Sequence, residues 1–331
     1  MSNIVAKVYR GDYLDLTHRA HVAVVDSKGK LLNYIGDPNR LTFVRSCAKP
    51  MQALVACEIG AIKAFGLNEA ELALLCASHN GEDVHTGSAK SILAKAGLDE
   101  SILQCGFHPS LDSKIAKTQP KILSEVYSNC SGKHLGMILS ALHLNENIQN
   151  YWEISHPHQQ RIIKTIADLC DLDFKDIYTA VDGCGVPVHA LSLKSFALGV
   201  ARMANPEQLS KERAEQVEKI VKSMIKNPFM VSGSNRLCTA LMEETQGKVF
   251  AKVGADGCYS VGVLKEGIGI MCKIEDGNIP IVEGLIVHLL YALRIIDKKA
   301  FDALEAFHSP PRKNHRDEIG GRVEYFINFN S

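Results

Sequence analysis

Short segments in which apolar and polar residues alternate gather at the two ends of the chain. We expect strands there, because alternation with a period of two places one face of a segment in the core. Glycine-containing turns separate the later segments, which is typical of an antiparallel meander. The expected strands are residues 4–8, 21–25, 30–35, 248–253, 259–264, 268–274 and 322–327.

The middle of the chain instead repeats apolar residues every three or four positions, which predicts helices. Asn68 with Glu71 forms a capping-box pattern, and Asn205-Pro206 is expected to cap a charged amphipathic helix. Residues 98–130 lack this periodicity and are expected to be irregular. The remaining helices are expected at residues 47–64, 86–95, 131–142, 157–169, 189–203 and 280–296, with one short strand at 177–181.

This layout indicates an α+β fold. Strands and helices do not alternate regularly, which disfavours a doubly wound parallel sheet. We expect an antiparallel sheet built from both chain ends, with flanking helices and a helical insertion. The chain is interpreted as a single unit over residues 1–331, with a sheet region at approximately 1–45 and 245–331 and a mostly helical region at approximately 46–244.

The charge balance excludes polyanionic partners. The 331 residues contain 37 Lys and Arg against 37 Asp and Glu, so the formal net charge is zero. A neutral chain has no general electrostatic attraction to nucleic acid or to an anionic membrane surface. We therefore expect no nucleic-acid partner and no membrane partner.

The chain shows no recognisable targeting segment. Residues 1–22 carry charges such as Lys7 and Arg10 and no continuous apolar core, so we expect no signal peptide. The longest apolar run, residues 284–296, is too short to span a bilayer. We therefore expect a cytoplasmic protein in which the ten cysteines are reduced thiols, most of them small buried hydrophobic residues.

The first candidate for chemistry is Ser46 with Lys49. Residues three apart on a helix lie one above the other, so a lysine amine there can accept the serine proton when burial lowers its pKa. The Ser-x-x-Lys pattern occurs three times, at Ser27, Ser46 and Ser223, and only Ser46 opens an apolar helix. The alternative interpretation is a helix-capping serine followed by a solvated lysine.

Two further elements strengthen this candidate. Ser78-His79-Asn80 follows the second helix, and Lys252-Val253-Gly254 lies on the first strand of the C-terminal meander. Ser-x-x-Lys, Ser-x-Asn and Lys-x-Gly in this order are the motifs of the penicillin-recognising serine enzymes. Singly, Ser78 is also compatible with a loop serine and Lys252 with an edge-strand lysine that discourages aggregation.

A second cluster of candidates contains cysteines. Cys130, Lys133 and His134 share one face at the start of a helix, where a thiol pKa is lowered, and Cys184 lies between glycines in a loop. Two thiolates from distant segments make a zinc site plausible, with Cys130, His134 and Cys184 as the conventional ligands. Spacing alone favours the alternative, two unrelated structural cysteines.

Five motifs taken together resemble the asparaginase II family of the rhizobial, thermolabile kind. The resemblance extends over nearly the whole chain, from about Val5 to Ile327. The motifs are Ser46-Cys-Ala-Lys-Pro50, Cys76-Ala-Ser-His-Asn-Gly-Glu82, Asn129-Cys-Ser-Gly-Lys-His134, Asp182-Gly-Cys-Gly-Val-Pro187 and Ala251-Lys-Val-Gly-Ala-Asp-Gly257.

The resemblance implies a serine β-lactamase and glutaminase-like fold, a homodimer, and hydrolysis of L-asparagine to L-aspartate and ammonia. It implies two catalytic Ser-Lys pairs, a bound zinc ion with a lysine ligand in place of His134, and three polar residues that bind substrate. The residues so implied are Ser46 with Lys49 and Ser78 with Lys252 for catalysis, Cys130, Lys133 and Cys184 for zinc, and Arg45, Asn80 and Asp182 for substrate.

Several alternatives stay open from the sequence. We hypothesise that Ser46 is the nucleophile, with Ser78 as the alternative, and His134 stays a candidate metal ligand. The same serine chemistry also fits a glutaminase, a β-lactamase or a D-peptidase. A non-enzymatic zinc- or redox-binding protein that uses Cys130 and Cys184 is the rival of a different class.

Overall fold

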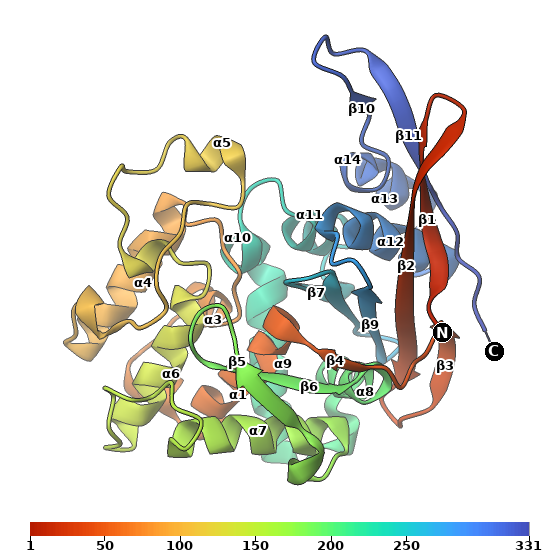
Figure 1. Cartoon of the computed structure of the whole chain (residues 1–331). Helices are drawn as coiled ribbons and strands as arrows, with labels where there is room; N and C mark the ends of the chain where they lie inside the picture. The colour runs from red at the N-terminus through yellow and green to blue at the C-terminus, as the bar shows by residue number, and fades with distance from the viewer. Residues whose placement is uncertain (331) are drawn as a thin grey trace.

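The computed structural model describes residues 1–330, and its main feature is a large antiparallel sheet that contains both chain ends (Figure 1). The strand order is β10-β11-β1-β2-β9-β8-β7, and β3 pairs with β2 off this path. The expected sheet from both ends is therefore confirmed. The strands are β1 (Asn3–Arg10), β2 (Tyr13–Asp26), β3 (Leu31–Ile35), β7 (Val249–Gly254), β8 (Cys258–Val263), β9 (Ile268–Ile274), β10 (Arg312–Lys313) and β11 (Ile319–Tyr325).

A second sheet of three strands was not expected. It has the order β4-β6-β5 and consists of β4 (Leu41–Phe43), β5 (Tyr178–Val181) and β6 (Pro187–Ser192). The expected helix over 189–203 is wrong in its first turn, because this segment pairs with a strand on either side. The helix α8 (Leu193–Ala204) begins only after Ser192, whose hydroxyl accepts a hydrogen bond from Ser195 N at 3.0 Å.

The helices fill the middle of the chain and part of its C-terminal region. The expected capping box of Asn68 and Glu71 is confirmed at the start of α3. The helices are α1 (Lys49–Glu58), α2 (Ala61–Ala64), α3 (Glu69–Leu75), α4 (Asp83–Ala96), α5 (Ser113–Ala116), α6 (Ser131–His143), α7 (Pro157–Cys170), α8, α9 (Lys211–Lys226), α10 (Pro228–Ser232), α11 (Leu237–Glu244), α12 (Ile279–Ala292), α13 (Lys298–Ala303) and α14 (Glu305–His308). Within residues 1–330 none of them is long and apolar enough to cross a membrane.

Two expected helices are divided by local backbone chemistry. The segment 47–64 starts as a 3₁₀ turn over Arg45–Ala48, continues as α1, and breaks at Gly60, which has a positive φ of 84°. Asn205 caps only the 3₁₀ turn Pro206–Gln208, and Ser210 caps the charged helix α9 itself. In each case the apolar pattern predicts one continuous helix, whereas the structure contains separate helical segments.

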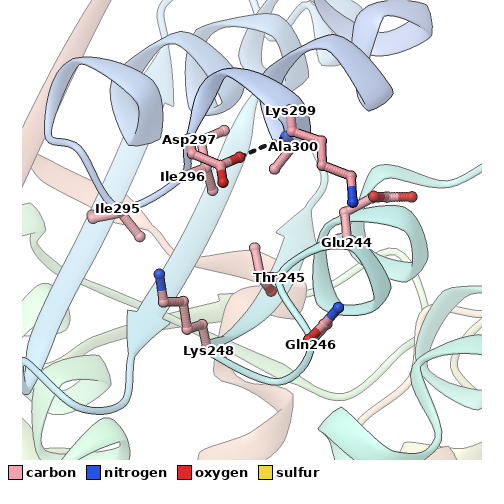
Figure 2. A pocket seen from close by; sticks show the side chains of 9 residues that line it. All are labelled: Glu244, Thr245, Gln246, Lys248, Ile295, Ile296, Asp297, Lys299 and Ala300. Atoms are coloured by element: carbon pink, nitrogen blue, oxygen red, sulfur yellow. Dashed lines mark hydrogen bonds between the residues drawn. The ribbon is translucent and has the colours of Figure 1, made fainter.

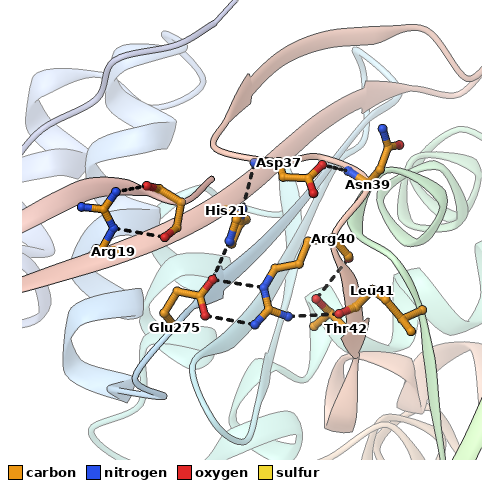
Figure 3. A network of polar contacts seen from close by, with 9 residues as sticks. Arg19, His21, Asp37, Asn39, Arg40, Leu41, Thr42 and Glu275 are labelled. Atoms are coloured by element: carbon orange, nitrogen blue, oxygen red, sulfur yellow. Dashed lines mark hydrogen bonds and ion pairs between the residues drawn. The ribbon is translucent and has the colours of Figure 1, made fainter.

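A partly exposed ion pair joins the main sheet to the segment that leads into the second sheet (Figure 3). Arg40 donates from Nε to Glu275 Oε1 at 3.1 Å and from Nη2 to Oε2 at 3.0 Å, and His21 Nε2 lies 2.6 Å from the same Oε1. The hydrogen bonds from Arg40 and His21 lower the pKa of Glu275 to about 2. This network fixes the start of β4, and the candidate site begins just beyond β4 at Arg45.

Candidate active site

Ser78 lies at the centre of a buried polar cluster between the main sheet and the helices. Its Oγ is 2.8 Å from Lys252 Nζ on β7 and 3.1 Å from Lys49 Nζ at the start of α1. Ser78 follows α3, and its N–H donates to Val231 O at 2.9 Å. All three polar side chains are buried, so residues from three distant parts of the sequence meet away from solvent.

The amine of Lys49 is surrounded by acceptors. Besides Ser78, it donates to Ala77 O at 2.6 Å and to Asn129 O at 3.2 Å, and it lies 3.2 Å from Cys130 Sγ. Buried charged groups are tolerated when they are paired and hydrogen-bonded in this way. Lys49 therefore links the serine of the cluster to the cysteines beside it.

Lys252 has the properties of a proton acceptor. Burial, and then the nearby charge of Lys49, lower the pKa of Lys252 to about 7. Its amine also contacts Val253 O at 2.8 Å. At neutral pH a substantial fraction of this amine is unprotonated and available to take a proton from Ser78.

Ser46 lies at the edge of the cluster. It is half-buried in the 3₁₀ turn before α1, whereas Ser78 is only 6% exposed. The backbone N–H of Lys49 donates to Ser46 O, but within residues 1–330 no side-chain hydrogen bond joins Ser46 to Lys49. The structure therefore pairs Lys49 with Ser78 and leaves Ser46 as the more accessible hydroxyl.

The proposed metal ligands come together at the start of α6. Lys133 Nζ lies 2.8 Å from Cys184 Sγ, and the thiols of Cys130 and Cys184 are close enough to shift the pKa of each other. His134 Nδ1 lies 2.7 Å from Tyr151 Oη, and its buried Nε2 has no hydrogen-bond partner within residues 1–330. The structure thus brings Cys130, Lys133 and Cys184 together, whereas His134 contacts Tyr151 through Nδ1.

The donor set suits zinc. The neighbouring Cys184 thiol, together with the charges of Lys49 and Lys133, lowers the pKa of Cys130 well below its ordinary value despite burial, whereas contact with Cys130 and burial raise the pKa of Cys184. Two sulfur atoms and one nitrogen atom are donors that zinc prefers. No group of three His, Cys, Asp and Glu residues within 1–330 could hold a metal, so a metal here would depend on Lys133.

Arg45 holds a pair of carboxylates beside Ser46. It contacts Asp182 Oδ1 through Nε at 3.0 Å and through Nη2 at 2.9 Å, and it also forms an ion pair with Asp256. Burial alone would raise the pKa of Asp182, but Lys133 and Arg45 lower it. Asp256 was not recognised from the sequence, although it lies four residues after Lys252 in a motif of the family resemblance.

Asn80 and His79 belong to the loop that carries Ser78. Asn80 Nδ2 donates to Ser234 O at 2.8 Å, which ties the loop to the segment after α10. His79 Nδ1 accepts from Gly81 N at 3.0 Å, so its Nε2 carries the proton and donates to Ser131 Oγ at 2.9 Å. His79 was also missed from the sequence, and its contacts show a role in fixing this loop.

One cavity away from these residues lies between the end of α11 and the connection from α12 to α13 (Figure 2). It has a volume of about 380 Å³, and Lys248 and Lys299 line it. Asp297, also in its wall, is engaged as the N-cap of α13 through Ala300 N at 2.9 Å. This cavity contains no residue of the serine and cysteine cluster.

The buried cluster of serine and lysine lies within an α+β fold. The family model for L-asparaginase II matches residues 6–325, nearly the whole chain. The protein therefore belongs to the L-asparaginase II family, and it is an amidohydrolase of this fold that acts on a small molecule.

Comparison with solved structures gives matches of low sequence identity. A β-lactamase from Mycobacterium bovis is 13% identical with a TM-score of 0.42, over 87% of this chain and 92% of that one. A class C β-lactamase variant is 13% identical with a TM-score of 0.42, over 81% and 90%. A D-alanine carboxypeptidase from Burkholderia cenocepacia is 13% identical with a TM-score of 0.38, over 86% and 92%. No curated protein matches the chain.

Proposed function

We propose that this protein hydrolyses L-asparagine to L-aspartate and ammonia through an acyl-enzyme on serine. The family supports the reaction, and one observation supports the chemistry: Ser78 Oγ lies between two buried lysine amines, at 2.8 Å from Lys252 and 3.1 Å from Lys49. A hydroxyl between two amines is suited to carry protons from one to the other.

In acylation, Ser46 attacks the side-chain amide carbon and Lys49 takes its proton. Lys49 can act as a base only when it is neutral, and Ser78 offers a route by which its proton passes to Lys252. Because its pKa is lowered, Lys252 is partly unprotonated at neutral pH and can accept the proton at the end of this route. Ser46 is assigned as the nucleophile because it is the more exposed of the two hydroxyls, and substrate must reach it.

Release of ammonia reverses the proton route. Lys252 returns a proton through Ser78 to the departing nitrogen, which leaves an ester between the acyl group and Ser46. Water then attacks the ester carbon, its proton follows the same route, and the Ser46 hydroxyl is regenerated with aspartate as product. Both half-reactions use the same two lysines.

The proposal includes a zinc site formed by Cys130, Lys133 and Cys184. Zinc held by two sulfur atoms and an amine is a weak Lewis acid, so it would organise the α-end of the substrate rather than activate water. Cys184 Sγ lies 3.8 Å from Asp182 Oδ2, and Asp182 in turn binds Arg45. The zinc residues therefore support the arginine that suits the α-carboxylate of an amino acid.

The test compares ammonia release by the wild type, Ser46→Ala and Ser78→Ala, on L-asparagine, L-glutamine and nitrocefin. We expect turnover of L-asparagine by the wild type and a loss of at least about a hundredfold in each variant. Mass spectrometry of quenched reactions separates the roles, since Ser46→Ala should form no acyl-enzyme and Ser78→Ala should form it slowly.

Other outcomes identify the rival functions. Preferred turnover of L-glutamine or nitrocefin would assign another serine hydrolase. Bound zinc without ammonia release would favour the non-enzymatic metal-binding protein. Near-normal turnover of L-asparagine by Ser46→Ala would contradict the assignment of this nucleophile.

We extend the proposal to a cytoplasmic homodimer, as the family resemblance implies. Exposed apolar side chains on the second sheet support a partner copy: Phe43 and Tyr178 both flank Ala190 in the strand register, and they are 43% and 62% exposed. Light scattering of the purified protein measures the mass, and a monomer at micromolar concentration would contradict the dimer.

A further inference from the structure

One guanidinium holds two carboxylates beside the proposed nucleophile. Arg45 reaches Asp182 through Nε and Nη2, and Asp256 through Nη1. The two carboxylates come from different parts of the fold: Asp182 begins the loop between β5 and β6, and Asp256 lies in the turn between β7 and β8. Two carboxylates therefore contact the same guanidinium next to Ser46.

The two carboxylates differ in exposure. The side chain of Asp182 is 12% exposed and that of Asp256 is 65% exposed. An ion pair in contact with water contributes little to stability, whereas a buried charge that loses its partner is costly. Asp256 is therefore the partner that Arg45 can release, and Asp182 is the partner that it keeps.

The backbone holds both ends of the exposed pair in uncommon conformations. Arg45 has φ of 50° and Asp256 has φ of 54°, in the left-handed region that residues other than glycine seldom adopt. Such conformations concentrate at ligand-binding sites. Lys273 donates to the carbonyl of Asp256, so the turn is anchored while its carboxylate faces solvent.

We propose that Asp256 binds the α-ammonium group of the substrate after the substrate's α-carboxylate has replaced it on Arg45. One ion pair is broken and two are formed, so the exchange favours a molecule that carries both charges. The inference rests on the proposed function, because a side-chain amide of an amino acid supplies these two groups. It adds a substrate-binding residue that selects for an amino acid over a simple amide.

Two substrates separate this role from simple support of Arg45. L-Asparagine carries both α-groups, whereas succinamate is the same amide without the α-amino group. Succinamate still has to displace Asp256 from Arg45 but gives the freed carboxylate no partner. Removing the charge of Asp256 should therefore weaken the binding of L-asparagine and leave the binding of succinamate unchanged or stronger.

The experiment measures kcat and KM for both substrates with the wild type and Asp256→Asn. Asparagine tolerates a positive φ, so the turn is retained in this variant. We expect KM for L-asparagine to rise about tenfold or more, the effect of losing a hydrogen bond between charged groups. KM for succinamate should stay the same or fall, because the competitor for Arg45 has been removed, and kcat for both should change by less than about threefold.

The matched control is Asp276→Asn. Asp276 is also an exposed acid in a turn at this end of the sheet, and its partner is His18 rather than a residue of the site. This variant should leave both KM values unchanged. Asp256→Glu keeps the charge and should recover part of the affinity for L-asparagine.

An equal rise in KM for both substrates would overturn the inference, because Asp256 would then act only by holding Arg45. An unchanged KM for L-asparagine would also overturn it. Ammonia release from neither substrate by the wild type is a different result: it would refute the proposed function, and the inference with it. Circular dichroism checks that each variant is folded.

Discussion

At the scale of single residues, the proposed mechanism makes Lys252 the group that determines the pH dependence of the reaction. Its pKa is lowered to about 7 in the folded protein, and the proposed proton route needs the neutral amine. We predict that kcat/KM for L-asparagine rises about tenfold per pH unit below this pKa and levels off above it. A pH profile from 5 to 9 measures the midpoint, and a flat profile through pH 7 would contradict the role of Lys252 as the base.

A stability measurement checks the same pKa independently of activity. The unfolded chain binds a proton at Lys252 with the ordinary pKa, so between about 10.4 and 7 the unfolded state binds more protons than the folded state. Folding at neutral pH therefore costs free energy, because Lys252 has to give up its proton. Lys252→Met removes this cost. The variant should be inactive, with a melting temperature above that of the wild type at pH 7, and the difference should shrink towards pH 10.

The residue scale also shows where sequence reasoning stopped. The pairing of Ser46 with Lys49 assumed one continuous α-helix, in which residues three apart are stacked. In the structure Ser46 belongs to the 3₁₀ turn Arg45–Ala48, whose first residue has a positive φ, and α1 begins only at Lys49. In this backbone conformation the Lys49 amine contacts Ser78 rather than the Ser46 hydroxyl. The sequence did not predict it, because no sequence pattern indicates an arginine with a positive φ.

At the scale of elements, Gly269 lets α8 pack closely on β9. A Cβ atom there would lie 1.9 Å from Ala197 O and 2.5 Å from Ala201 N, both backbone atoms of α8. We predict that Gly269→Ala lowers the free energy of unfolding by about 3 kcal/mol, because the whole helix has to move. Denaturant unfolding followed by circular dichroism measures this.

Gly320→Ala is the matched control for that prediction. Gly320 lies in β11 of the same sheet, and the nearest atom to an added Cβ is Arg312 O at 4.0 Å. The free energy of unfolding should change by less than about 0.5 kcal/mol. Equal effects of the two substitutions would mean that the intrinsic preference of the strand, and not the contact with α8, determines the cost.

Elements also differ in how well the sequence predicted them. The meander of β7, β8 and β9 was predicted because its turns contain glycine and its strands are short. Residues 189–192 were assigned to a helix, because a short buried apolar run does not distinguish a central strand from a helix. In the second sheet β5 and β6 are neighbours in the chain, but β4 pairs with β6 from a distant part of the sequence, and local patterns do not report that pairing.

At the scale of the whole molecule, the proposed zinc site connects the helical region to substrate binding. We predict that removing zinc with a chelator raises KM for L-asparagine more than it lowers kcat, because the metal residues support Asp182 and Arg45 rather than the serines. Kinetics before and after dialysis, with zinc measured on the same samples, test this. A large fall in kcat with unchanged KM would contradict it.

Cysteine variants locate the metal. Cys184→Ser should lose zinc, whereas Cys170→Ser should retain it, since Cys170 is a buried thiol at the end of α7, outside the cluster. Zinc retained by both variants would place the metal elsewhere. Zinc absent from the wild type would refute the site.

The overall architecture was predictable because the strand patterns lie at both ends and the helical periodicity lies between them. The order of the motifs predicted which residues gather, and Ser78 and Lys252 do meet at 2.8 Å. Asp256 was missed because its contact with Arg45 spans 211 positions and depends on two positive φ angles. Long-range contacts of this kind become visible only when the sheet is assembled.

The placement of both chain ends in one sheet has a consequence for synthesis on the ribosome. Strands β1 and β2 are translated well before their partners β11 and β9. The nascent chain therefore contains both serines and Lys49 long before it contains Lys252, and pairing across such separations is slow. A chain that has not yet reached Lys252 lacks the amine at the end of the proposed proton route, so the proposed serine chemistry requires the meander of β7, β8 and β9 to have been made.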